Sequence, residues 1–177
     1  SVDGVLFNKD KSKLITYPDG KTDNTYEIPN SVTSIGVRAF SNCRSLTSVT
    51  IPDSVTSIGE NAFYGCTNLT SVIIPDSVTS IGSYAFKDCT SLTSITIPNS
   101  VESIGDNAFQ NCSSLTSATI GNNVTSIGSS AFFGCSKLKK IEIPDSVTYI
   151  GSKAFDGTAF YNTVKNWEDG FFIAVII

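Results

Sequence analysis

Residues 51–72 read IPDSVTSIGENAFYGCTNLTSV, and close copies of this stretch recur along the chain with a period of 23 residues. The period is clearest at the aromatic residue of each copy: Phe40, Phe63, Phe86, Phe109, Phe132 and Phe155. Cysteines recur with the same period: Cys43, Cys66, Cys89, Cys112 and Cys135. Repeats of this length are typical of solenoids, in which each copy forms one coil and packs only on its neighbours. We therefore predict one solenoid domain over residues 1–177.

The first half of each copy has the pattern of strands. In residues 46–51, apolar and polar side chains alternate, which predicts a strand with Ser48 and Thr50 facing outward. Pro52 follows and ends the strand, because proline cannot donate a backbone hydrogen bond. The apolar pair in residues 55–58 predicts a second, shorter strand.

The second half of each copy predicts a corner and a helical turn. Every copy carries a glycine at the position of Gly59, and we expect it to form a corner with positive φ. Ala62, Phe63, Cys66 and Leu69 then follow at the spacing of one short helical turn with its apolar side inward. No single coil could close a core alone, so neighbouring coils must share one.

The two ends of the chain depart from the repeat. Residues 1–27 read as an N-terminal hairpin that caps the first coil, and residues 28–157 hold the six 23-residue repeats. Residues 158–177 form a degenerate repeat or a C-terminal cap. The apolar run 171–177 is too short for a membrane helix, and it is either a buried strand or an exposed edge that pairs chains.

Composition argues against several classes of function. The net charge of −4 disfavours nucleic acid as a partner, and no apolar run approaches the roughly 20 residues that membrane insertion needs. The sequence has no histidine, the commonest general base and metal ligand. Its cysteines lack the close pairs of metal sites and fit a buried, packed row. We therefore expect a non-catalytic protein without a cofactor.

The signature in residues 51–72, repeated in six copies, resembles the BspA-like leucine-rich-repeat family of bacterial surface proteins. The resemblance covers residues 28–157 closely. It implies a right-handed, β-rich leucine-rich-repeat solenoid with a parallel β-sheet, short second strands and single helical turns in each coil. It also implies that the sheet is a concave recognition surface and that the protein is extracellular, with an export signal outside this chain.

The candidate binding residues are the outward side chains of the strands and several variable aromatics. The strand candidates are Ser48, Thr50, Ser71, Ile73, Ser94, Thr96, Ser117 and Thr119. The aromatic candidates stand where the copies differ, so stacking does not dictate them: Tyr64, Tyr84, Phe133 and Tyr149. Aromatic residues are enriched in binding sites, which favours the aromatic candidates. Serine and threonine are also ordinary solvent-exposed strand residues, so the strand candidates have an alternative explanation without a partner.

Three functions remain open from the sequence. The first is a cell-surface adhesion module that binds a host matrix protein or another cell-surface protein through the Ser/Thr-rich sheet. The second is a passive stalk or spacer within a larger surface protein. The third is a glycan-binding module that uses Tyr64, Tyr84 and Tyr149.

Overall fold

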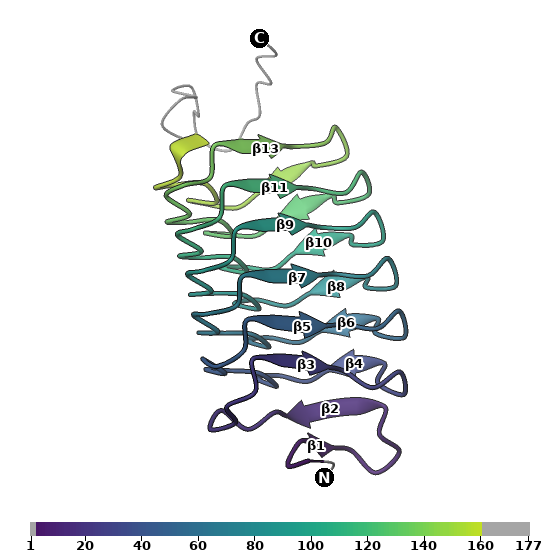
Figure 1. Ribbon diagram of the computed structural model, residues 1–177. Coiled ribbons are helices and arrows are strands. Elements are labelled where there is room, and N and C mark those ends of the chain that lie inside the picture. The colour runs from purple at the N-terminus through teal and green to yellow at the C-terminus, as the bar shows by residue number, and fades with distance from the viewer. Residues whose placement is uncertain (1–2, 161–177) are drawn as a thin grey trace.

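The computed structural model describes residues 3–160, which form a stack of similar coils (Figure 1). Each coil begins with a three-residue strand: β3 (Thr25–Glu27), β5 (Ser48–Thr50), β7 (Ser71–Ile73), β9 (Ser94–Thr96), β11 (Ser117–Thr119) and β13 (Lys140–Glu142). A two-residue strand follows in each coil: β4 (Ser34–Ile35), β6 (Ser57–Ile58), β8 (Ser80–Ile81), β10 (Ser103–Ile104), β12 (Ser126–Ile127) and β14 (Tyr149–Ile150). Strand pairs between coils are parallel and join equivalent residues, such as Val49 and Val72. The predicted solenoid with parallel sheets and short second strands is confirmed.

The strands form one long sheet and two short ones. The second strands lie in an eight-stranded sheet of order β1-β2-β4-β6-β8-β10-β12-β14, whereas the first strands form two three-stranded sheets, β3-β5-β7 and β9-β11-β13. Strands β7 and β9 lie side by side (Figure 1) but belong to different sheets. The row of first strands is therefore interrupted at its middle.

The N-terminal segment is a hairpin that extends the long sheet. Strand β1 (Leu6–Phe7) pairs antiparallel with β2 (Lys13–Thr16), and β2 pairs parallel with β4 of the first coil. The buried ring of Tyr17 follows β2 and stacks on Phe40 with 5.3 Å between centroids.

The division into cap, repeats and tail stays a prediction. The prediction for 171–177 lies outside the described residues.

A column of phenylalanine rings forms the centre of the core. Between consecutive rings from Phe40 to Phe155, the centroids lie 4.9 to 5.5 Å apart and the planes differ by 1° to 11°. Each ring is buried, and so are the alanine before it and the cysteines that follow it. The period in the sequence thus becomes contact between equivalent side chains of neighbouring coils.

The predicted helical turn is wrong: in the described coils, this segment is a series of tight turns. Two residues of each coil have positive φ, for example Asn61 at 55° and Gly65 at 68°. A right-handed helix cannot continue through such residues. Turn bonds instead alternate with bonds between coils. The Ala62 N–H donates to the Gly59 carbonyl at 3.2 Å, while the Phe63 N–H donates to the Ala85 carbonyl at 2.7 Å.

The expected reason for the repeated glycine is also wrong. Gly59 and its equivalents are not among the residues with positive φ. They lie close to the backbone of the preceding coil: a Cβ on Gly82 would stand 2.7 Å from the Glu60 nitrogen and 2.8 Å from the Gly59 carbonyl carbon. Glycine recurs because a side chain has no room there.

Candidate functional site

The strand candidates form one surface, which we call the strand face: the outward side chains of β3, β5, β7, β9, β11 and β13. Register places Ser48 beside Ser71 and Thr50 beside Ile73 in one short sheet. In the other short sheet, Ser94 lies beside Ser117 and Thr96 beside Thr119. Ser48 and Ser117 are half-buried and the other six are exposed. The two outward rows therefore run along the stack, with neighbouring side chains about 5 Å apart within each sheet.

Ile73 is the apolar exception on the strand face. Its side chain is 81% exposed, the highest value among the exposed large hydrophobic residues of the described chain. It occupies the position that threonine holds in three other coils, and it ends β7 beside the break between the two short sheets. Val72 next to it is 8% exposed, against 3% for Val49 of the preceding coil. The middle of the strand face thus carries a single projecting apolar side chain.

Open hollows lie beside the strand face near both ends of the stack, and we call the line of positions that joins them the axial groove. Near the first coil, a hollow of about 460 Å³ is lined by Glu27, Ile28, Asn30, Thr50, Pro52, Asp53 and Ser54. Near the last coil, a hollow of about 510 Å³ is lined by Thr119, Ile120, Asn122, Glu142, Ile143, Pro144, Asp145 and Ser146. The two sets are equivalent positions of coils one and two and of coils five and six. The same kind of hollow therefore forms near both ends of the described stack.

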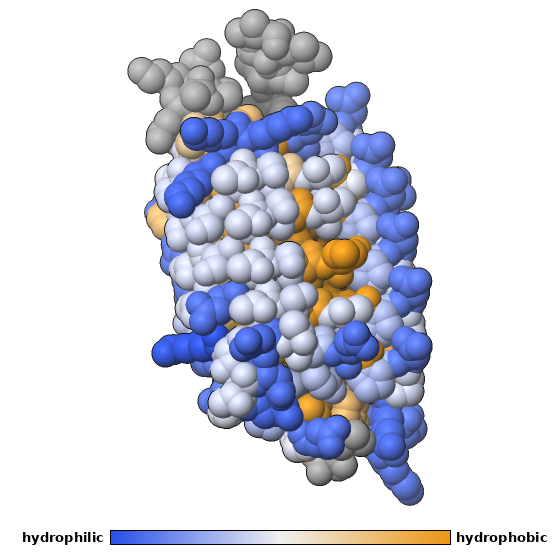
Figure 2. All heavy atoms as spheres, in the orientation of Figure 1, coloured by the Kyte–Doolittle hydropathy of each residue, from blue (hydrophilic) through white to orange (hydrophobic). Residues whose placement is uncertain are grey.

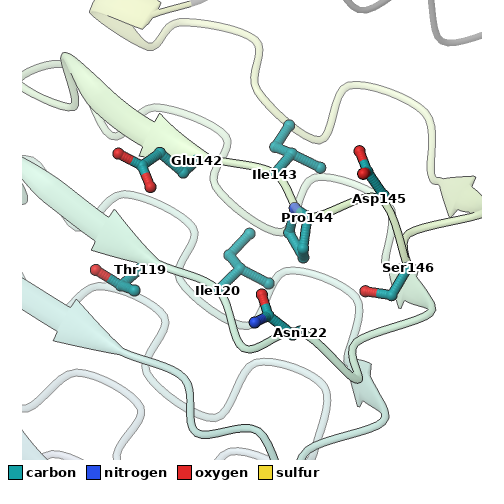
Figure 3. A pocket seen from close by; sticks show the side chains of 8 residues that line it. All are labelled: Thr119, Ile120, Asn122, Glu142, Ile143, Pro144, Asp145 and Ser146. Carbon is teal, nitrogen blue, oxygen red and sulfur yellow. The ribbon is translucent and has the colours of Figure 1, made fainter.

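The walls of the axial groove differ in chemistry. In Figure 3, Thr119 and Glu142 stand on the strand side, Asp145 and Ser146 on the turn side, and Ile120, Ile143 and Pro144 between them. Figure 2 shows the same order on the whole molecule, with apolar surface between the pale Ser/Thr side and the blue margin of turns. The floor of each hollow is apolar because a buried isoleucine that follows a strand lines it: Ile28 in the first hollow and Ile120 in the second.

The charged side chains that line the hollows are all carboxylates. Glu27 and Asp53 line the first hollow, and Glu142 and Asp145 line the second. All four are exposed. Beside the second hollow, Lys140 Nζ lies 3.8 Å from Glu142 Oε1 in an exposed ion pair. The sequence analysis did not predict these hollows, although the register of the repeat aligns the acidic positions of the end coils.

The structure separates the four aromatic candidates from the strand face. Tyr64, Tyr84 and Phe133 lie in the segment of tight turns and are half-buried. Tyr149 begins β14 in the long sheet and is 58% exposed. Tyr84 has a local partner, since the ammonium of Lys87 lies 5.5 Å from its ring centroid. The predicted site residues therefore do not form one site.

Many other serine and threonine hydroxyls join the coils. Ser54 Oγ donates to the Val32 carbonyl at 2.7 Å, and Ser77 Oγ donates to the Val55 carbonyl at 2.6 Å. Thr47 Oγ1 donates to the Asn24 carbonyl at 3.0 Å. Their abundance is largely explained by this bonding between coils. The strand-face hydroxyls, which point to solvent, are a distinct set.

The cysteine row has no reactive character. The Cys66 thiol donates to the Phe40 carbonyl at 2.9 Å, and Cys89 makes the same contact with Phe63 at 3.2 Å. Burial raises the pKa of Cys66 and Cys89 well above the ordinary value, which keeps both thiols protonated.

Within residues 3–160, no three His, Cys, Asp or Glu side chains are grouped to hold a metal ion. No helix in that range has the length and apolar character to span a membrane.

Comparisons with known proteins identify the repeat. The family model described as BspA type leucine rich repeat region (6 copies) matches residues 21–113 and 57–169. No curated protein sequence gives a significant match. Among solved structures, a leucine-rich repeat protein of T. pallidum is 32% identical, with a TM-score of 0.80 over 89% of this chain and 75% of its own.

Two further structures are similar over about half of their own length. A leucine-rich repeat protein of Eubacterium ventriosum is 30% identical, with a TM-score of 0.74 over 93% of this chain and 50% of its own. A leucine-rich cell surface protein of Faecalibacterium prausnitzii is 35% identical, with a TM-score of 0.63 over 89% of this chain and 52% of its own. The repeat signature, the parallel coils and these matches together establish that the chain belongs to the BspA-type leucine-rich repeat family.

Proposed function

We propose that this chain is a non-catalytic binding module that holds a partner protein on its strand face. The observation that carries the proposal is Ile73, which is 81% exposed at the centre of a face whose other outward residues in β5, β7, β9 and β11 are Ser and Thr. Burying such a side chain in a complex contributes about 1.5–3 kcal/mol, enough for an interface anchor. The surrounding Ser and Thr side chains keep the uncomplexed face compatible with water.

The proposed setting is a cell surface, with a host matrix protein or a cell-surface protein as partner. Membership of the BspA-type family supports this setting, and so does the similarity to a protein of F. prausnitzii described as a cell surface protein. A passive stalk is the second candidate. It is favoured by the inter-coil bonds of the serine and threonine hydroxyls, which make one continuous rod without any ligand.

The test is a binding screen of the chain against matrix and cell-surface proteins by biolayer interferometry. Ile73→Ser and the double variant Ser94→Arg/Thr96→Arg change the strand face, while Tyr149→Ser removes an exposed aromatic from the other sheet and is the control. We expect a partner whose affinity falls about tenfold or more in the strand-face variants and is unchanged in the control.

Two results would count against the binding proposal. A partner that binds the strand-face variants as tightly as the wild type would place its site elsewhere on the rod. A screen in which no protein binds this chain, while a neighbouring domain of the parent protein binds, would favour the stalk.

A further inference from the structure

The axial groove offers an apolar centre and two acidic ends in one line. Ile73 projects from the third coil, while Glu27 and Asp53 line the hollow at the first two coils. Glu142 and Asp145 line the equivalent hollow at the last two coils. Between them, the turn-side row continues with the exposed residues Asp76, Asn99 and Asn122. Along this line, carboxylates stand at both ends and at Asp76, and Ile73 is the exposed apolar side chain between the two hollows.

We infer that the axial groove binds an extended segment of a partner protein that carries one large apolar side chain between two basic ones. The inference rests on the proposed function and names the kind of partner that its surface fits. The apolar side chain packs against Ile73, and the basic side chains approach the carboxylates of the two hollows. The chain's net charge of −4 adds long-range attraction for such a segment.

The spacing of the coils sets the spacing of the partner's side chains. Parallel strands lie about 4.8 Å apart, so Glu27 is roughly 10 Å and Glu142 roughly 14 Å from the level of Ile73 along the stack. An extended chain rises about 3.3 Å per residue. The two basic residues should therefore stand about three residues to one side of the apolar residue and about four to the other.

Lys140 places a positive charge beside one of the two acidic hollows. Its ammonium lies 3.8 Å from Glu142 and partly neutralises that carboxylate, although both side chains are exposed. Removing the ammonium leaves Glu142 fully available to a basic side chain of the partner. The Lys140→Ser variant should therefore bind such a segment more tightly than the wild type does.

The test uses labelled synthetic peptides and fluorescence anisotropy with the whole chain. The peptide KSTLTSTK has the expected spacing, KLTSTSTK has the same composition with the apolar residue displaced, and ESTLTSTE reverses the charge. We expect KSTLTSTK to bind about tenfold more tightly than either control, and to weaken as salt is added. Ile73→Ser, Glu27→Gln and Glu142→Gln should each weaken it, Lys140→Ser should strengthen it, and Tyr149→Ser should leave it unchanged.

Equal binding of KSTLTSTK and either control peptide would overturn the inference, and so would failure of all three peptides to bind. These outcomes are separate from those of the proposed function. If a partner protein loses affinity with Ile73→Ser yet is indifferent to Glu27→Gln, Glu142→Gln and salt, the binding function stands. The charge pattern assigned to its partner is then wrong.

Discussion

At the scale of the residue, the repeated glycine and cysteine both serve contacts with the backbone of the preceding coil. A Cβ on the repeated glycine would meet the backbone of the preceding coil at less than 3 Å, and the buried cysteines donate to carbonyls of that coil. Both residue types are small because the neighbouring backbone leaves little room for a side chain. Their recurrence therefore reflects stacking and indicates no ligand.

Gly82→Ala tests this explanation. The new Cβ would lie 2.7 Å from a backbone nitrogen, so the two coils must move apart, and we expect a loss of about 1–3 kcal/mol in the free energy of unfolding. Gly20→Ala is the matched control, because no atom lies within 4 Å of its Cβ position. The measurement is denaturation with urea followed by circular dichroism. Equal stability of the two variants would contradict the close-packing explanation.

At the scale of the element, the N-terminal hairpin closes the open end of the aromatic column. The Tyr17 ring stacks on Phe40 at 5.3 Å and meets Tyr26 edge-on at 4.8 Å, in the place that a phenylalanine of a preceding coil would take. Its hydroxyl lies 3.3 Å from an oxygen of Asp23, which also pairs with Lys21 at 3.0 Å. The hairpin thus supplies the first coil with both a ring and a paired strand.

Tyr17→Ala should cost about 3–5 kcal/mol of unfolding free energy, because it removes a buried ring from the end of the column. It should also open the first coil, so that Cys43 reacts with a thiol reagent before the other cysteines do. Tyr17→Phe keeps the ring and should cost only about 1 kcal/mol. Ile15→Ala, at a partly exposed position of the same hairpin, is the control. Uniform protection of all thiols in Tyr17→Ala would show that the hairpin does not hold the first coil.

At the scale of the whole molecule, the coils share one core, and its thiols couple stability to pH. Burial raises the pKa of Cys43 to about 12 and raises those of Cys66, Cys89 and Cys112 further above the ordinary value. In the unfolded chain these thiols ionise near pH 8.5. Their stabilising contribution is therefore complete below pH 8.5 and is lost as the pH rises from there toward 12.

Each such thiol should lower the free energy of unfolding by about 1.4 kcal/mol for every pH unit above 8.5. Urea denaturation between pH 7 and pH 10 measures the slope. The Cys89→Ala variant removes one ionising group and should show a shallower slope than the wild type, whatever its stability at pH 7. The same slope in both proteins would mean that the buried thiols do not govern the alkaline loss of stability.

The sequence by itself determined the repeat, the register and the buried column, because equivalent residues of a solenoid meet at every period. It also determined that Ser48, Thr50 and their equivalents share one outward face. Asn61 and Gly65 carried a signal for positive φ that could have excluded the helical turn, since asparagine and glycine favour that conformation.

Only the tertiary structure decided which features lie together around the coil. The path of the tight turns separates Tyr64 and Tyr84 from the strand face, and the closure of each coil places Asp53 across the axial groove from Thr50. It also decides that the repeated glycine serves close approach and that Ile73 stands beside a break between sheets. The physical reason is that a period specifies what lies above and below each residue, whereas the backbone angles within one coil specify what lies beside it.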